Sequence, residues 1–349
     1  MRIALVSERL RPPYDEGIKN FAIHLLRGLQ ACGHATLALT TEGESDPELG
    51  LQNVAANRLL LNEELREAVA GFEPEVILYI PTACGTAFSL VRGRVLHFYY
   101  PSSLLVLLLL QPRPQSPGAR LLMRGLRPDL VLAQSTTTAL PFRKLGWRTA
   151  LFGPAVDSQR FRPASAADRS QLRSRFSVPE DRHVVLHVGH LKEKRNLLQV
   201  LTLHDTPGYH VLIVASTSTE QDARLGAELR SRGATVVDHY VADIENIYRL
   251  SDAYVFLAEE ETAAIDLPLS VVEAMACNLP VVSTPFGGLP DSFREGDGLV
   301  FWQSSKDLRQ AVDRAMKGRI ATRNKVEGRT WQVMADELVG LVADDKDES

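Results

Sequence analysis

One strand-loop-helix stretch in the second half of the chain carries residue types suited to binding an anion and a sugar ring. Pro268 suits the entry to a helix, and Ser270 suits its N-cap or first turn. The backbone N–H groups of Leu269, Ser270 and Val271 would then point outward from the positive end of the helix, where an anion is stabilised. Glu273 lies one turn further on, where a carboxylate can accept hydrogen bonds from two vicinal hydroxyls. The stretch predicts a site for a phosphate and a ribose.

A second candidate is the basic loop that begins at Gly189 and reads GHLKEKRN. The Arg195 guanidinium can bind two phosphate oxygens at once, and Lys194 adds an adjacent charge. The charge of His190 depends on pH. A solvated basic turn has the same composition, but the position of this loop after an apolar run and before a helix favours phosphate binding.

These loops need strands and helices to hold them, and both alternate along the chain from its first residue. Apolar runs predict strands at 2–6, 36–40, 76–80, 95–99 and 130–133, and again at 184–188, 210–215, 235–237, 253–257 and 280–283. Helical spacing predicts helices at 18–30, 197–203, 222–232, 244–250 and 270–277. This rhythm indicates an α/β protein with two doubly wound domains, whose sheets carry ligands in a cleft at the carboxyl ends of their strands.

The bulk composition excludes several classes of protein. The 349 residues are 45% hydrophobic and 23% charged with a net charge of −4, as in an ordinary globular protein and not in a general nucleic-acid binder. The three cysteines include no Cys-x-x-Cys pair, which fits a reducing compartment and neither a disulfide framework nor a zinc site. The apolar run at the N-terminus is too short for a signal peptide. We expect a cytoplasmic protein.

Residues 104–127 combine a leucine-rich run with four arginines, Arg113, Arg120, Arg124 and Arg127. Apolar side chains beside arginines are what a patch on an anionic membrane surface needs. A buried helix followed by a solvated loop has the same pattern. The first reading predicts peripheral association with the inner face of a membrane, and the second predicts none.

The string SVVEAMACNLPVVSTPFGGLPD, from Ser270 to Asp291, resembles the signature of the retaining glycosyltransferases of the group 1, family 4 type, which have the GT-B fold and an E-x7-E motif. The resemblance implies two Rossmann-like domains that face each other across a cleft. They would be an acceptor-side domain at 1–155 and a donor-binding domain at 156–325. A final segment at 326–349, which contains Trp331, would cross back to the first domain.

The resemblance implies that Glu273 binds the donor ribose and that Leu269, Ser270 and Val271 bind its diphosphate. The first Glu of the motif would fall at Ile265, which cannot do a carboxylate's work. The loop before it is longer by about four residues than the family pattern when counted from the preceding strand. Either Glu261 or Asp266 replaces the missing Glu, or sugar recognition differs in this protein.

Further positions follow from the same resemblance. His190 and Arg195 stand where the family has an arginine and a lysine facing the diphosphate. Ser216 and Tyr240 follow strands whose ends face the donor, Tyr240 at the base. Gly17, after Glu16, lies in a loop near the donor phosphate or the acceptor, although a plain tight turn also needs glycine. His97 is a candidate catalytic residue together with Arg195 and Lys194, although its predicted position within a strand is more common for a core histidine.

The predicted function is transfer of a hexose-type sugar from a UDP- or GDP-sugar to a glycan, lipid-linked or small-molecule acceptor, with retention of anomeric configuration. No Asp-x-Asp pair ends a strand, so neither a metal nor a cofactor is expected. The basic loop and the helix N-terminus would stabilise the leaving group. Two alternatives stay open: a nucleotide-sugar epimerase of similar architecture, and a non-catalytic nucleotide-sugar-binding subunit.

Overall fold

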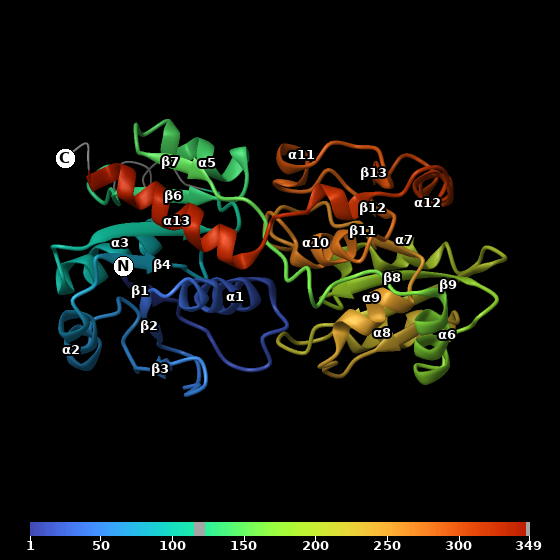
Figure 1. Cartoon of the computed structure of the whole chain (residues 1–349), viewed down its shortest axis with the longest axis horizontal. Helices are drawn as coiled ribbons and strands as arrows, with labels where there is room; N and C mark the ends of the chain where they lie inside the picture. The colour runs from blue at the N-terminus through green and yellow to red at the C-terminus, as the bar shows by residue number, and fades with distance from the viewer. Residues whose placement is uncertain (115–122, 347–349) are drawn as a thin grey trace. The chain divides into compact units, whose positions relative to one another are not determined.

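The structure, a computed structural model, describes residues 1–114 and 123–346. The chain divides into two compact units: the first contains Met1–Gly153 and the C-terminal segment from Trp331, and the second contains Pro154–Thr330. Each unit is built on one parallel sheet with helices around it (Figure 1). The predicted α/β fold class with two doubly wound domains is confirmed.

The first unit has a seven-stranded sheet in the order β3-β2-β1-β4-β5-β6-β7. Its interior strands are apolar runs buried on both faces, as expected of a parallel sheet covered by helices. The strands are β1 (Arg2–Val6), β2 (Ala35–Thr40), β3 (Leu51–Asn53), β4 (Val76–Tyr79), β5 (Leu104–Leu109), β6 (Leu130–Ala133) and β7 (Thr149–Leu151). The helices are α1 (Gly17–Ala31), α2 (Glu63–Phe72), α3 (Ala87–Tyr99), α5 (Thr136–Arg143) and α13 (Trp331–Lys346).

The last helix of the chain, α13, packs along α1 in this unit (Figure 1). The Trp331 ring stacks on His24 with centroids 5.2 Å apart and meets the edge of Phe21 at 5.3 Å. Gly28 lets the two helices approach closely, because a β-carbon there would collide with the backbone of Trp331. The segment that follows the second unit thus completes the core of the first.

The second unit has a six-stranded sheet in the order β10-β9-β8-β11-β12-β13. Its strands are β8 (His183–Gly189), β9 (Tyr209–Ala215), β10 (Thr235–Val237), β11 (Ala253–Phe256), β12 (Val281–Ser283) and β13 (Leu299–Phe301). Its helices are α6 (Ala166–Arg175), α7 (Leu197–Leu201), α8 (Ala223–Ser231), α9 (Ile244–Leu250), α10 (Leu269–Ala276), α11 (Leu289–Ser292) and α12 (Leu308–Met316), with 3₁₀ turns η1 (Glu193–Arg195) and η2 (Thr322–Lys325). Successive β8 residues enter different cores, Val184 and Leu186 on one face and Val185 on the other.

One predicted strand is wrong. Residues 95–99 are the end of α3, which starts at the Thr86 N-cap, where the side chain of Thr86 accepts a hydrogen bond from the backbone of Ser89. The strand of this region is β5, the leucine run itself, which pairs with β4 and β6. The side chains of Leu105 to Leu109 are almost completely buried. The run of apolar residues before Pro101 imitates a strand, but the N-cap and the buried positions Leu90 and Leu96 fit a helix.

Candidate functional site

The strand order of the second sheet creates a topological switch point between β8 and β11. The chain proceeds outward from β8 to β9 and β10, then returns to β11 on the other side of β8. Because these strands are parallel, their carboxyl ends lie on one edge, and the loops leaving β8 and β11 diverge there. Such a divergence is the usual ligand crevice of an open α/β sheet. The predicted basic loop and the segment leading to α10 are these two loops.

The basic loop after β8 is fastened to the loop after β11 by its cationic and polar side chains. Arg195 is only 4% exposed, and its guanidinium carbon lies 5.3 Å from the centre of the Phe256 ring. Lys194 Nζ donates to the carbonyl of Thr262 at 3.0 Å, and Asn196 Nδ2 donates to the carbonyl of Leu257 at 2.8 Å. Two cations are thereby held at the switch point.

His190 is part of this loop and Ser216 lies beside it, whereas Tyr240 is further away. His190 Nδ1 and Thr219 Oγ1 are 2.6 Å apart, so the ring is tied to the loop after β9. The backbone N–H of Ser216 donates to the carbonyl of Gly189 at 2.8 Å. Tyr240 follows β10, two strands from β8, and is 53% exposed. The first two residues therefore border the switch point, and Tyr240 lies toward the edge of the sheet.

The N-terminus of α10 differs in one detail from the predicted anion site. Pro268 is the N-cap, and the N–H of Val271 donates to its carbonyl at 3.0 Å. This internal bond counts against a diphosphate role for Val271 and leaves Leu269 and Ser270 as the candidates for backbone donors. The side chain of Ser270 hydrogen-bonds the hydroxyl of Tyr254 on β11, which links the helix to the sheet.

Glu273 is half-buried and has one partner that the sequence did not reveal. The hydroxyl of Tyr248, on α9, donates to Glu273 Oε2 at 2.7 Å. Burial raises the pKa of Glu273 to about 7, although the Tyr248 bond acts in the opposite direction. One carboxylate oxygen is thus oriented by the protein, and the group titrates near neutral pH.

The two predicted replacements for the missing Glu both lie in the loop between β11 and α10, but they differ in exposure. Glu261 is exposed, whereas Asp266 and Ile265 are 1% and 2% exposed. Gly287 packs against the backbone of Asp266, where a β-carbon would collide. Gly288 N–H donates to the Asp266 carbonyl at 2.8 Å. These glycines fix the end of the loop.

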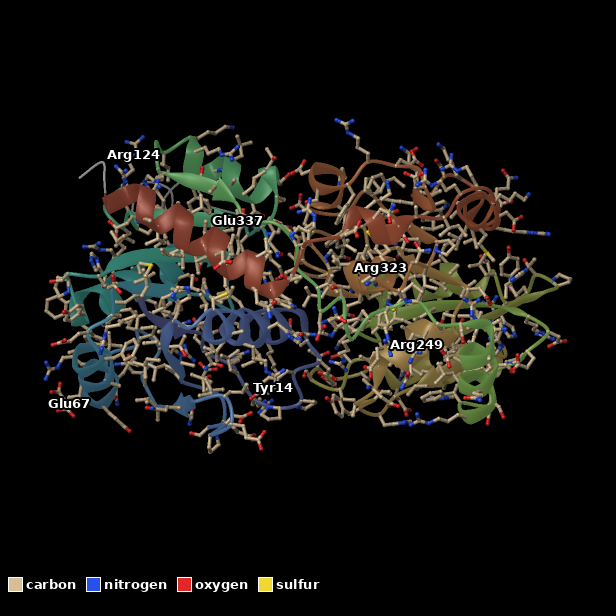
Figure 2. The ribbon with its side chains drawn as sticks, viewed as in Figure 1. Tyr14, Glu67, Arg124, Arg249, Arg323 and Glu337 are labelled. Atoms are coloured by element: carbon tan, nitrogen blue, oxygen red, sulfur yellow. The ribbon has the colours of Figure 1, made fainter. Side chains whose placement is uncertain are left out.

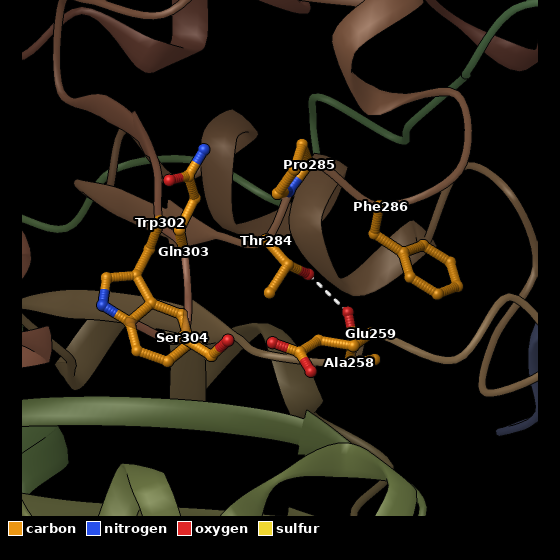
Figure 3. A pocket seen from close by; sticks show the side chains of 8 residues that line it. All are labelled: Ala258, Glu259, Thr284, Pro285, Phe286, Trp302, Gln303 and Ser304. Carbon is orange, nitrogen blue, oxygen red and sulfur yellow. Dashed lines mark hydrogen bonds between the residues drawn. The ribbon is translucent and has the colours of Figure 1, made fainter. Parts of the chain in front are cut away.

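A pocket of about 240 Å³ opens at the carboxyl ends of β11, β12 and β13 (Figure 3). Its polar lining includes Glu259, at the start of the same loop, together with Gln303 and Ser304. Thr284 closes one wall by donating to the carbonyl of Ala258 (Figure 3). Glu259 is a carboxylate on the loop that was not among the predicted replacements.

In the first unit, Gly17 lies at the end of the loop after β1, as predicted, whereas His97 lies in a helix and not in the predicted strand. Gly17 is the first residue of α1, and the side chain of the N-cap Glu16 accepts a hydrogen bond from the Lys19 backbone at 3.3 Å. A carboxylate therefore already occupies this helix end. His97 lies in the last turn of α3, which leads into the amino end of β5, and its ring nitrogens contact Arg94 and the carbonyl of Pro101. That is the sheet edge opposite to the usual ligand side, which counts against a catalytic role.

The apolar half of the predicted membrane patch at 104–127 is also wrong, because Leu105 to Leu110 are at most 1% exposed within and just after β5. Arg124 and Arg127 are exposed, and Figure 2 labels Arg124 at the surface. Arg120 lies outside the described residues. Within residues 1–114 and 123–346, no helix is long and apolar enough to cross a membrane.

The chain resembles known glycosyltransferases in sequence and in fold. Residues 168–330, most of the second unit, match the family model described as glycosyl transferases group 1. A GDP-mannose-dependent alpha-mannosyltransferase of Mycobacterium tuberculosis is 27% identical, over 97% of this chain and 96% of that protein. Both matches are similarities to glycosyltransferases.

Two solved structures share the architecture. Sucrose-phosphate synthase from Thermosynechococcus elongatus superposes with a TM-score of 0.77 at 17% identity, over 100% of both chains. Anabaena HepE in complex with UDP superposes with a TM-score of 0.74 at 17% identity, over 99% of this chain and 100% of that one. At these identities the likeness establishes the fold, and the predicted GT-B class is confirmed.

Proposed function

We propose that this chain transfers a hexose-type sugar from a nucleoside-diphosphate sugar to an acceptor, with retention of anomeric configuration. The observation that carries the proposal is the arrangement at the switch point of the second sheet. Arg195 and Lys194 follow β8, the N-terminus of α10 follows β11, and Glu273 lies one turn into that helix. Cations, backbone donors and a carboxylate are the groups that a diphosphate joined to a ribose requires.

In the proposed complex the donor is divided between these groups. Arg195 and Lys194, with the Leu269 and Ser270 N–H groups, take the diphosphate. Glu273 takes the ribose hydroxyls through the oxygen that Tyr248 does not occupy. His190 and Ser216 border the phosphates, and Tyr240 stays assigned to the base.

The chemical step requires charge stabilisation on the departing nucleoside diphosphate. Arg195 and the positive end of α10 supply it without a metal, because both are held in place before the donor arrives. Same-face attack by the acceptor as the diphosphate leaves would retain the configuration. The relative that covers nearly the whole chain is named as an alpha-mannosyltransferase that depends on GDP-mannose, itself an α-linked donor, which supports retention.

That relative also makes GDP-mannose the first donor to test. Sugar recognition falls to the loop from Glu259 to Asp266, where the exposed Glu261 and the buried Asp266 remain alternatives. The acceptor is a glycan, a lipid-linked sugar or a small molecule.

The test begins with a thermal-shift screen of GDP, UDP, ADP and TDP and of their sugar conjugates, since a ligand that binds the native state raises the melting temperature. The donor found is then incubated with a panel of sugar, polyprenyl-linked and inositol-containing acceptors. We expect release of the nucleoside diphosphate with a glycosylated product whose anomeric coupling matches the donor. An isomerised nucleotide sugar would instead identify an epimerase. Tight donor binding without turnover on any acceptor would favour the non-catalytic subunit.

A further inference from the structure

A histidine that belongs to neither loop lies directly beneath the proposed diphosphate site. His187 is on β8, two residues before Gly189, and is 0% exposed. Its ring stacks on Tyr254 and Phe256 of β11, with centroids 6.4 and 6.3 Å away. Its Nδ1 lies 3.0 Å from the carbonyl oxygen of Val255. Three contacts from one strand thus fix the orientation of the ring.

The second ring nitrogen is an exception among buried polar atoms. His187 Nε2 has no hydrogen-bond partner among the residues that the structure describes. Most buried side-chain nitrogens have a partner, and a leucine would fill the same volume without the cost of burying one that lacks it. The unused nitrogen therefore calls for a functional explanation.

Nε2 points toward the start of the basic loop. A β-carbon placed on Gly189 would lie 3.3 Å from His187 Nε2 and 3.4 Å from Arg195 Nη1. The imidazole and the guanidinium therefore both border the space that a side chain at Gly189 would enter. A larger residue there would crowd both groups, and its backbone would also be strained at the Gly189 φ of +157°.

The proton on this imidazole is assigned by its neighbours. A carbonyl oxygen can only accept, so Nδ1 carries the hydrogen toward Val255, and Nε2 of the neutral ring offers a lone pair. Burial first, and the charge of Arg195 second, lower the pKa of His187 to about 3. The ring is neutral at physiological pH and cannot compete with Arg195 as a second cation.

We propose that His187 is a positioning residue: in the donor complex its Nε2 accepts one N–H of Arg195 and turns the remaining guanidinium N–H groups toward the diphosphate. The inference rests on the proposed function, since it assigns to Arg195 the phosphate contact proposed above. A guanidinium has five donors in a planar fork, so the fixing of one edge orients the other. His187 does not touch the substrate.

The experiment is a double-mutant cycle on the affinity of the full chain for GDP and UDP, measured by calorimetry. His187→Leu keeps the volume and removes the acceptor, and we expect it to weaken nucleoside diphosphate binding by about tenfold or more, as for a hydrogen bond to a charged group. In an Arg195→Ala background the same substitution has no further effect, because the group that it positions is gone. His187→Gln, which can place an amide oxygen near the Nε2 position, restores most of the affinity.

His210→Leu is the matched control. His210 is a buried histidine on the neighbouring strand β9, near its amino end, and its Nε2 is 3.0 Å from Thr235 Oγ1. Its loss removes a buried imidazole from the same sheet without touching the basic loop, so binding stays at the wild-type value. Circular dichroism and thermal melting check that each variant is folded, and His187→Gln tests the inference if His187→Leu does not fold.

The outcomes separate the two proposals. If wild type binds a nucleoside diphosphate but the His187→Leu loss is equally large with and without Arg195, the positioning role is overturned and the proposed function stands. If His187→Gln binds the nucleoside diphosphate as poorly as His187→Leu does, His187 Nε2 does not act as a hydrogen-bond acceptor, and the inference is overturned on that ground. If wild type binds none of the nucleoside diphosphates in the thermal-shift screen, the proposed function fails and the inference fails with it.

Discussion

The two sheets have the same switch-point topology, but the charged groups described at their switch points are opposite in sign. In the first unit, Glu8 follows β1, is 2% exposed and pairs with Arg92 at 2.6 Å. It also accepts hydrogen bonds from the Tyr79 hydroxyl and from the backbone and side chain of Thr82, after β4. In the second unit, Arg195 and Lys194 contact an aromatic ring and a carbonyl.

The same strand order therefore holds a structural ion pair in the first unit and a candidate binding site in the second. The Glu8 carboxylate is neutralised by a cation of its own unit and joins the loops after β1 and β4, so this cluster stabilises the fold and offers no net charge. In the second unit the Arg195 guanidinium lies near the Phe256 ring and the Lys194 ammonium donates to the Thr262 carbonyl, so positive groups are placed where an anion would bind. Function is thus inferred from the groups at the switch point and not from the strand order.

The largest expected effect comes from removing the cation of the second switch point. Arg195→Ala should lower kcat/KM for the sugar donor by about 100-fold to 1000-fold, the loss seen when one preorganised group that stabilises transition-state charge is removed. The effect on the melting temperature should be small by comparison, because Arg195 packs over Phe256 but is not part of the apolar core clusters. Steady-state kinetics and thermal melting measure both.

Arg232→Ala is the control for charge alone. Arg232 is exposed and pairs with the exposed Asp205, so its loss should leave kcat/KM unchanged. Equal turnover in wild type and Arg195→Ala would remove the second switch point as the donor site.

Removing the ion pair between Glu8 and Arg92 at the first switch point should lower the stability of the fold and leave donor binding unchanged. Glu8→Ala leaves Arg92 buried without its carboxylate and should lower the free energy of unfolding by about 3 kcal/mol, as for a broken buried ion pair. Denaturant titration of the full chain measures the loss. Nucleoside diphosphate binding by folded protein should stay near the wild-type value. A stable Glu8→Ala variant with impaired donor binding would mean that the two switch points do not divide stability and binding as described.

The third effect is a pH dependence that belongs to the second switch point alone. Burial raises the pKa of Glu273 to about 7, and we expect its ionised form to bind the ribose best. Donor affinity should therefore rise about tenfold from pH 6 to pH 8, as the carboxyl loses its proton, and Glu273→Gln should abolish this rise. Calorimetry at several pH values in constant ionic strength measures it.

The same raised pKa has the opposite sign for stability. The native state of the free protein holds the Glu273 proton more tightly than the unfolded chain, so this contribution is present below the unfolded pKa and is lost as pH rises through 7. Glu273→Gln should accordingly melt above wild type at pH 8 and close to it at pH 5. A wild-type donor affinity that is flat between pH 6 and pH 8 would contradict the ribose assignment.

Much of this organisation could be predicted from the sequence, because interior parallel strands read as continuous apolar runs and their loops share one edge. The positions of Arg195 and Ser270 follow from that rule. The sequence does not predict the edge strands β3, β7 and β13, although it predicts the edge strand β10, which is equally short. The apolar residues at the end of α3 imitate the strand that actually comes next.

The contacts that hold the side chains of the site in place could not be predicted in the same way. The bond from Lys194 to Thr262 joins residues 68 positions apart, and the bond from Tyr248 to Glu273 joins two helices. His187 reads as one more residue in a buried strand; only its ring contacts and its unused nitrogen distinguish it from core. Such contacts depend on side-chain directions that the spacing of residues does not encode.

The smallest expected effect concerns metal ions, and it tests whether the cations of the second switch point suffice. If Arg195, Lys194 and the N-terminus of α10 hold the charge of the departing diphosphate, excess EDTA should change kcat by less than about twofold, because no electrostatic contribution is lost. Activity is compared before and after chelation and after addition of Mg²⁺ or Mn²⁺. A large loss that either ion restores would show that the switch point is incomplete without a metal. The exposed carboxylates Glu259, Glu260 and Glu261 beside it would then be the residues to replace next, since hard divalent cations prefer carboxylate oxygens.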